Sequence, residues 1–161
     1  LIALTACRPG EAADAEWEEF DFEDAVWRRH AAKMKARRDH ISPLSTQAIA
    51  VLKGLQRITG GGRYLFPHRS GKGFTTPNRL TYAMRDMNLG RGTTPHCWRT
   101  TFSTWANENG FRPDAIERQL AHVESNKVRA TYNKALLLDQ RRSLLQAWAG
   151  YLSTAEHSGT E

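Results

Sequence analysis

The segment TPHCWRTTFSTW (Thr94–Trp105) combines a helix start signal with two side chains that can bind an anion. Thr94 is a suitable N-cap and the proline after it suits the first helical position, which predicts a helix over His96–Asn109. In such a helix His96 and Arg99 lie on one face, three residues apart. A guanidinium fork and an imidazole near a helix N-terminus suit a phosphate, although packing at the helix end is an equally good interpretation of His96.

The same signals predict helices on both sides of this segment. Ser45 is a plausible N-cap for a helix that Gly60 ends, and Thr76 starts another helix with apolar residues on one face. Further helical segments are predicted at residues 1–4, 11–16 and 113–122, around Tyr132, and at 138–152.

Short strands are predicted only before Ser45. Trp17–Phe22 and Ala25–His30 alternate in polarity and are joined by a turn, and residues 40–44 add a third strand. The predicted fold class is therefore mainly α with a small antiparallel β-sheet (α+β). A polar tail at 153–161 is expected to be flexible. Such a fold is compatible with many functions.

The composition is that of an ordinary globular domain. With 161 residues, 40% of them hydrophobic and 25% charged, the chain is expected to form one domain. It has no apolar run of about 18 residues and no secretory leader, which favours a cytoplasmic protein with no membrane partner. Cys7 and Cys97 lack the spacing of a disulfide framework or a zinc site and are expected to be reduced thiols.

The net charge of +6 conceals a strong asymmetry. Residues 1–24 hold eight acids and one base, whereas residues 25–161 hold twenty-two bases and nine acids, a net charge of +13. A basic field of this size, with aromatic residues interleaved, favours nucleic acid over a membrane surface as the partner. A merely soluble basic surface is the alternative interpretation.

Two further segments carry cationic candidates. Arg8 in TACRPGE lies at the start of a turn, and Glu11 three residues later could hold its side chain in one orientation. An isolated Arg/Glu pair, in contrast, is usually a salt bridge of small value. The segment AAKMKARRDH contains Lys33 and Lys35, which share a face if the segment is a strand, so periodicity does not choose between them.

The segment QLAHVESNKVRATYNKA adds His122 at a helix end and Tyr132 ten residues later. Packing is the ordinary use of such a tyrosine. Together with the cations, however, the set supplies what phosphoryl transfer needs, namely a nucleophile, charge-neutralising clamps and proton donors. Because Asp and Glu do not cluster among these residues, neither a metal nor another cofactor is expected. The arginines could take the charge-stabilising role that a metal plays elsewhere.

These residues, in this order, resemble the catalytic domain of the tyrosine recombinase, or phage integrase, family. The matching segments are LTACRPGEAADAEW, KMKARRDHISPLS, YLFP, TPHCWRTTFSTW and LAHVESNKVRATYNKA. MKARRDHISPLS and NKVRATYN are most similar to integrases of prophages and genomic islands. The resemblance implies the DNA breaking-rejoining catalytic fold over residues 1–152.

The resemblance also implies how the phosphate is bound. Arg8 and Arg99 would hold the non-bridging oxygens of the scissile phosphate, and His122 would donate a hydrogen bond to it. Glu11 would brace the site from behind.

The remaining roles concern bond breaking. Tyr132 would attack the phosphorus to form a 3′-phosphotyrosyl bond, and His96 would exchange a proton near it. Lys35 would protonate the departing 5′-oxygen, and is preferred to Lys33 because it follows Met34 and precedes His40 by five residues. A free phenol is only about one part in a thousand ionised at pH 7, so Tyr132 needs such cationic surroundings.

The resemblance also implies a context for the activity. Duplex DNA with attachment sites would be the partner, the protein would act on it as a homo-oligomer, a tetramer in relatives, and DNA-bending or directionality proteins could assist. A bacterial, nucleoid-associated location follows. Reaction by transesterification needs no ATP or metal.

The chain departs from the family in two respects. TACR and LAH carry alanine where many relatives have glycine, which is expected to alter helix packing slightly and to remove no catalytic group. The chain is expected to be an N-terminally truncated fragment that starts inside a helix and lacks the DNA-clasping and arm-binding domains. A DNA-binding remnant without turnover and a type IB topoisomerase-like relaxation activity are the alternative functions.

Overall fold

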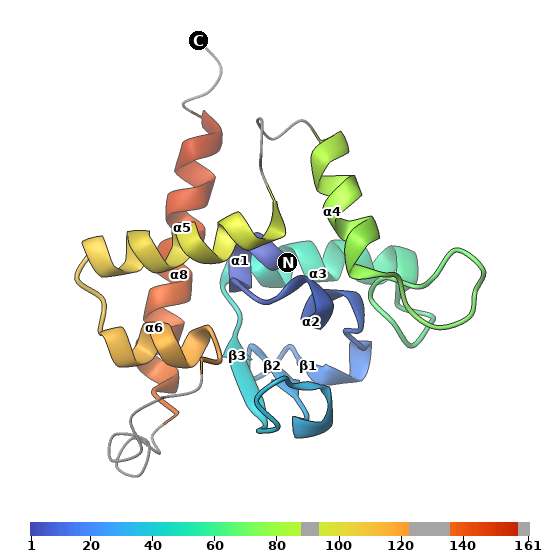
Figure 1. Cartoon of the computed structure of the whole chain (residues 1–161), viewed down its shortest axis with the longest axis horizontal. Coiled ribbons are helices and arrows are strands. Elements are labelled where there is room, and N and C mark those ends of the chain that lie inside the picture. Colours follow the sequence, from blue (N-terminus) through green and yellow to red (C-terminus); the bar gives the residue numbers. More distant parts are fainter. Residues whose placement is uncertain (88–93, 123–135, 158–161) are drawn as a thin grey trace.

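The computed structural model describes residues 1–87, 94–122 and 136–157, with side chains as far as Thr154. Within these ranges there is one small sheet, and the helices lie above and beside it in the view of Figure 1. The helices are α1 (Ile2–Thr5), α2 (Pro9–Ala13), α3 (Thr46–Thr59), α4 (Pro77–Asp86), α5 (Pro95–Glu108), α6 (Pro113–Gln119) and α8 (Leu138–His157), with 3₁₀ turns η1 (Trp17–Glu19) and η2 (Ala31–Lys33). None of the helices in the described ranges is long and apolar enough to span a membrane.

The predicted caps start the long helices. The hydroxyl of Ser45 accepts a hydrogen bond from the backbone N–H of Ala48 at the start of α3. Thr76 and Thr94 cap α4 and α5 in the same way, and each is followed by a proline at the first helical position. These bonds satisfy backbone donors that lack a partner inside the helix.

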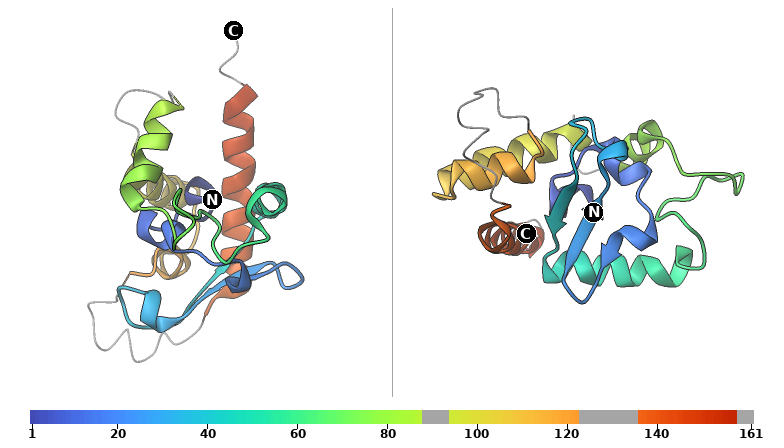
Figure 2. Two further views of the ribbon diagram at one scale, coloured as in Figure 1. Left: turned by 90° about the vertical axis from the view of Figure 1, so that its right-hand side faces the viewer. Right: turned by 90° about the horizontal axis from the view of Figure 1, so that it is seen from below.

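The sheet has the strand order β1-β2-β3 and is antiparallel throughout. It consists of β1 (Phe20–Asp21), β2 (Val26–Arg29) and β3 (His40–Pro43). The register places Trp27 opposite both Phe20 and Ser42. In the view from below, α8 is seen nearly end-on beside the sheet edge that β3 forms (Figure 2). The predicted α+β class is confirmed.

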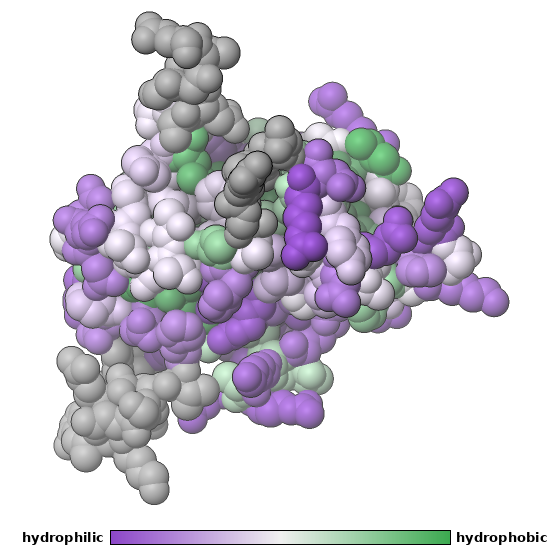
Figure 3. Space-filling model, turned by 45° about the horizontal axis from the view of Figure 1, so that its top comes forward, coloured by the Kyte–Doolittle hydropathy of each residue, from purple (hydrophilic) through white to green (hydrophobic). Residues whose placement is uncertain are grey.

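Two hydrophobic clusters form the core. The first lies between the sheet, α1, α2 and α3 and includes Phe20 and Trp27, whose rings stack with centroids 5.2 Å apart. The second joins α5, α6 and α8 around Phe102 and Trp148, which are fully buried. One view of the surface shows mostly hydrophilic residues with apolar ones in small separate areas (Figure 3).

A buried polar network connects the two halves of the fold. The guanidinium of Arg141 on α8 donates to the side-chain oxygen of Gln119 on α6 and to the backbone oxygen of Ile41 in β3. Gln119 in turn donates to Thr5 O and Ser42 Oγ, both at 2.8 Å. Burial and the nearby Arg118 lower the pKa of Arg141 to about 9, so it remains charged at neutral pH. The side chains of Arg141 and Gln119 thus join α8, α6, β3 and α1.

Four predicted boundaries were wrong. The helix predicted at 11–16 is α2, which covers Pro9–Ala13 and ends with Asp14 as its C-cap. Trp17–Glu19 is a 3₁₀ turn and not a strand, because Trp17 N–H pairs with Arg63 O and Glu19 N–H closes a turn onto Glu16 O. The predicted helix at 113–122 ends at Gln119. Conversely, α8 runs to His157, so residues 153–157 are helical where a flexible tail was predicted.

Local hydrogen bonds explain the longer α8. The hydroxyls of Ser153 and Thr154 donate to the backbone oxygens of Ala149 and Tyr151, so these polar residues bond within the helix that their composition was expected to end. The end of the predicted tail, 158–161, and the predicted helix around Tyr132 lie outside the described residues.

Candidate active site

Arg99 lies on the second turn of α5 and is buried, with 6% of its surface exposed. One terminal nitrogen of its guanidinium donates to Ala6 O, and the other donates to Leu120 O at 2.8 Å. Burial, and then the neighbouring charge of Arg8, lower the pKa of Arg99 from its usual value. Arginine nevertheless stays protonated in proteins, so α5 presents a fixed positive charge here.

Arg8 is the N-cap residue of α2, and Glu11 holds it at two points. The carboxylate of Glu11 accepts from the backbone N–H of Arg8 at 2.9 Å and from its guanidinium at 3.0 Å. The side chain of Glu11 is only 10% exposed, whereas that of Arg8 is 30% exposed. The contact between Arg8 and Glu11 that the sequence suggested is therefore present in the structure.

His122 follows α6 and turns back toward Arg99. Its Nε2 lies 3.4 Å from Nη2 of Arg99, and its Nδ1 lies 2.8 Å from a carboxylate oxygen of Glu117. An ionised carboxylate only accepts hydrogen bonds, so Nδ1 carries the hydrogen and Nε2 points into the site. Ala121 directs the side chain of His122 toward Arg99, because its left-handed backbone, with φ 50°, reverses the chain directly before His122.

The structure separates the two lysines that periodicity left undecided. Lys33 is bound by two buried carboxylates, with Nζ 2.6 Å from Glu16 and 2.7 Å from Glu19. Lys35 is exposed and lines a cavity of about 460 Å³ together with Arg8 and His122. These residues do not form a strand, so the two side chains lie in different surroundings.

The remaining two predicted residues are His96 and Tyr132. His96 is exposed on the first turn of α5, one turn before Arg99. Tyr132 lies outside the residues that the structure describes. The structure therefore brings together four of the predicted residues, Arg8, Lys35, Arg99 and His122, with Glu11 behind Arg8.

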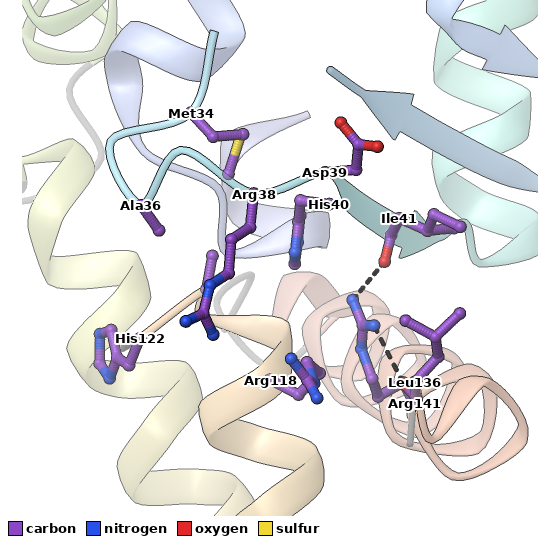
Figure 4. Close-up of a pocket in the computed structure, with 11 residues that line it drawn as sticks. Met34, Ala36, Arg38, Asp39, His40, Ile41, Arg118, His122, Leu136 and Arg141 are labelled. Atoms are coloured by element: carbon purple, nitrogen blue, oxygen red, sulfur yellow. Dashed lines mark hydrogen bonds between the residues drawn. The ribbon is translucent and has the colours of Figure 1, made fainter. Parts of the chain in front are cut away.

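A second, smaller pocket of about 60 Å³ adjoins the first and shares His122 with it. Arg38, His40 and Arg118 lie around this pocket, and Arg141 closes it from α8 (Figure 4). Burial, and then the charges of Arg141 and Arg118, lower the pKa of His40 to about 3. His40 is consequently neutral at pH 7 inside a strongly positive field.

Sequence reasoning missed Glu117 as a partner of His122. The two residues are five apart, whereas neighbours on a helix face are three or four apart. The contact depends on the end of α6, where His122 N–H bonds to Glu117 O. The sequence shows Glu117 shortly before LAH, but it does not predict the chain reversal that brings this glutamate to His122.

No group of three or more His, Cys, Asp or Glu side chains that could hold a metal occurs among the described residues. The titratable groups around the cavity are instead mainly cationic, with Glu117 and Glu11 as the carboxylates that orient them. Chemically, such an arrangement is suited to bind a phosphate and to neutralise charge that develops on it.

The fold is shared with solved integrases. An integrase from the mycobacterium phage Brujita superposes with a TM-score of 0.72 at 17% identity, over 91% of this chain and 48% of that one. The Tn1549 transposon integrase, solved in complex with circular intermediate DNA, superposes with a TM-score of 0.56 at 20% identity, over 88% of this chain and 54% of that one. These similarities define the class of the fold, which is that of integrases.

The chain belongs to the phage integrase family, whose model matches residues 1–137. The prophage integrase IntA of Escherichia coli (strain K12) is 41% identical over 159 residues, which are 95% of this chain and 37% of that protein. The chain thus spans well under half the length of this relative.

Proposed function

We propose that this chain is the catalytic domain of a site-specific DNA recombinase that integrates or excises a mobile element. One observation carries the proposal: Arg8, Lys35 and His122, from three separate parts of the chain, line one cavity, and Arg99 lies against His122 at its side. Membership of the phage integrase family supports the same activity.

Arg8 and Arg99 are proposed to clamp the scissile phosphate. Each guanidinium is oriented by protein oxygens, Arg8 by Glu11 and Arg99 by two backbone carbonyls. Since the fork geometry of arginine matches two phosphate oxygens, both residues can bind without reorganising during the reaction. His122, with Nε2 toward Arg99, would add a donor to the same phosphate once protonated.

Tyr132 is proposed to attack the phosphorus, forming an O–P bond while the bond to the 5′-oxygen breaks. Lys35 gives its proton to that oxygen, so a 5′-hydroxyl leaves. His96 would take the phenolic proton and return it on rejoining. The exposed side chain of Lys35 at the cavity supports this choice, because Lys33 is bound by carboxylates. Rejoining reverses these transfers, and the number of phosphodiester bonds is conserved.

Duplex DNA is the proposed substrate, and we propose that the protein acts on it as a homo-oligomer, with DNA-bending or directionality proteins as accessory partners. The excess of basic residues after position 24 and the DNA complex of the Tn1549 integrase support DNA as the partner. A bacterial protein acting at the nucleoid is consistent with the prophage relative.

The test is covalent trapping. The protein is incubated with a nicked suicide substrate that carries its attachment site, and products are separated on a denaturing gel. We expect a protein–DNA adduct that is lost in Tyr132→Phe and retained with EDTA. An equal adduct in Tyr132→Phe would rule out this nucleophile, and strong inhibition by EDTA would indicate a metal nuclease. DNA binding with no adduct in the wild type would favour a binding remnant.

A further inference from the structure

Lys33 has no role in the proposed reaction, yet it makes two short ionic contacts only two residues before Lys35. Its ammonium lies 2.6 Å from Glu16 and 2.7 Å from Glu19, and it also donates to Asp14 O at 3.2 Å. The two carboxylates are 4% and 9% exposed. An ammonium that neutralises two buried carboxylates has little freedom to move, since leaving would strand both charges.

This ion cluster fixes the turn that carries Lys35. Lys33 ends the 3₁₀ turn η2, and the next residue, Met34, is buried with 3% of its surface exposed. Arg29 donates to the backbone oxygen of Lys33 at 3.5 Å from the strand below. Two consecutive residues are therefore anchored, and Lys35 is the first residue beyond the anchor that reaches the cavity.

The same cluster reaches the other side of the site. Arg29 is 3% exposed and donates to Glu11 O at 2.7 Å and to the carboxylate of Asp14 at 2.9 Å. Glu11 in turn orients Arg8. The distance between the phosphate clamp and the turn with Lys35 is thus set through shared hydrogen bonds and ion pairs.

We propose that Lys33 is a positioning residue that acts through Lys35. It holds the turn in the position from which the ammonium of Lys35 reaches the departing 5′-oxygen. This inference rests on the proposed function, because it requires Lys35 to protonate that oxygen. Lys33 itself does not touch DNA. Its contribution is to the proton transfer alone and not to phosphate binding or to the attack of Tyr132.

The chemistry of the leaving group provides the test. In a substrate with sulfur at the 5′-bridging position, the thiolate leaves without a proton, since a thiol has a pKa near 8.5. A defect that acts through Lys35 therefore disappears with sulfur, whereas a folding or binding defect remains. Single-turnover adduct formation is measured on both substrates for the wild type, Lys33→Met, Lys33→Arg and Lys35→Ala.

We expect Lys33→Met to slow cleavage of the oxygen substrate by about tenfold to a hundredfold, as displacement of a catalytic group does, and to leave the sulfur substrate within about twofold. Lys33→Arg keeps a cation between Glu16 and Glu19 and should recover most of the rate. Arg63→Met is the matched control: Arg63 binds Glu16 at 2.8 Å but lies outside the turn, so both rates should be unchanged.

Each other outcome has a definite meaning. Equal losses on both substrates, or no loss on either, would overturn the role of Lys33 while leaving Lys35 in place. If Lys35→Ala does not slow adduct formation more on the oxygen substrate than on the sulfur substrate, then Lys35 is not the general acid. The inference about Lys33 is then wrong as well.

Discussion

At the scale of single residues, Arg99 is held by backbone carbonyls, and no carboxylate in the described part of the chain forms an ion pair with it. Ala6 O and Leu120 O each accept one hydrogen bond from its guanidinium. A carboxylate in their place would neutralise the charge, whereas carbonyl dipoles orient the group and leave the charge for a ligand. The buried position further strengthens attraction to an anion, because the local dielectric constant is low.

This geometry makes Arg99→Lys a sensitive substitution. Lysine keeps the charge but has one nitrogen, which cannot bond to both carbonyls and face a phosphate in a fixed plane. We expect adduct formation to fall about 10²- to 10³-fold, as after loss of one oxyanion donor, and DNA affinity to change little. Trapping on the suicide substrate and a gel-shift titration measure the two quantities.

Arg112→Lys is the control, since Arg112 is exposed and pairs only weakly with Asp114 at 3.7 Å. Its adduct formation should match the wild type. If Arg99→Lys cleaves at the wild-type rate, Arg99 does not clamp the phosphate.

The sequence predicted some residue contacts and not others for a physical reason. Arg8 and Glu11 are neighbours in a single helical turn, so their contact follows from local geometry. The contacts of Arg99 with Ala6 O and Leu120 O bridge 93 and 21 residues. No local pattern encodes such contacts, and only the packed fold shows that the arginine is fixed.

At the scale of elements, two helix ends beside the site are closed by alanine in the left-handed region. Ala6 ends α1 with φ 52°, and Ala121 follows α6 with φ 50°. Both lie one or two residues before a candidate site residue, Arg8 or His122. An L-residue with a Cβ pays about 1–2 kcal/mol for this conformation, which glycine adopts freely. The alanines therefore strain the backbone, beyond the slight change in packing that the sequence suggested.

Replacing Ala121 by glycine should relieve this strain. We expect Ala121→Gly to raise the free energy of unfolding by about 0.5–1 kcal/mol, after the extra entropy of glycine in the unfolded chain is subtracted. Ala121 is partly exposed, so little buried surface is removed. Urea denaturation measures the change.

The control is Ala50→Gly on the exposed face of α3, where φ is helical. It should lower the free energy of unfolding by about 1 kcal/mol. A loss of stability in Ala121→Gly as well would show that the chain reversal at α6 is not strained by alanine.

Helix starts were predictable and helix ends were less so. Threonine or serine followed by proline, or by apolar spacing, marks a start through one local hydrogen bond. The end of α6 depends on the left-handed backbone of Ala121, and an alanine in the sequence does not predict that conformation. The 3₁₀ turn at Trp17–Glu19 depends likewise on a partner, Arg63 O, that lies far along the chain.

At the scale of the whole molecule, the acidic first segment neutralises bases from the rest of the chain. Asp14, Glu16 and Glu19 form ion pairs with Arg29, Lys33 and Arg63, and Asp21 and Asp24 pair with Arg28. The asymmetry that the sequence showed as +13 after position 24 is thus partly cancelled inside the fold. The exposed bases beside the cavity, such as Lys35 and Arg38, keep their charge for a ligand.

The hairpin formed by β2, β3 and the residues between them offers a matched pair of arginines to test this division. Arg38 precedes β3 and lines the pocket that adjoins the cavity, whereas Arg28 lies within β2, opposite Ile41, and binds Asp24 at 2.6 Å. If DNA lies over the cavity, Arg38 faces phosphates and Arg28 does not. Because each neutralised phosphate releases counterions, the dependence of binding on salt reports the number of such phosphates.

We expect Arg38→Gln to reduce the slope of log K against log salt concentration by about 0.9 for each phosphate that residue 38 ceases to neutralise. Arg28→Gln should leave the slope unchanged, although it removes the same formal charge, because Arg28 is already neutralised by Asp21 and Asp24. Titrations of a labelled duplex at four salt concentrations measure both slopes. Equal reductions in the two variants would mean that DNA responds only to net charge, and that the cavity does not determine where the duplex lies.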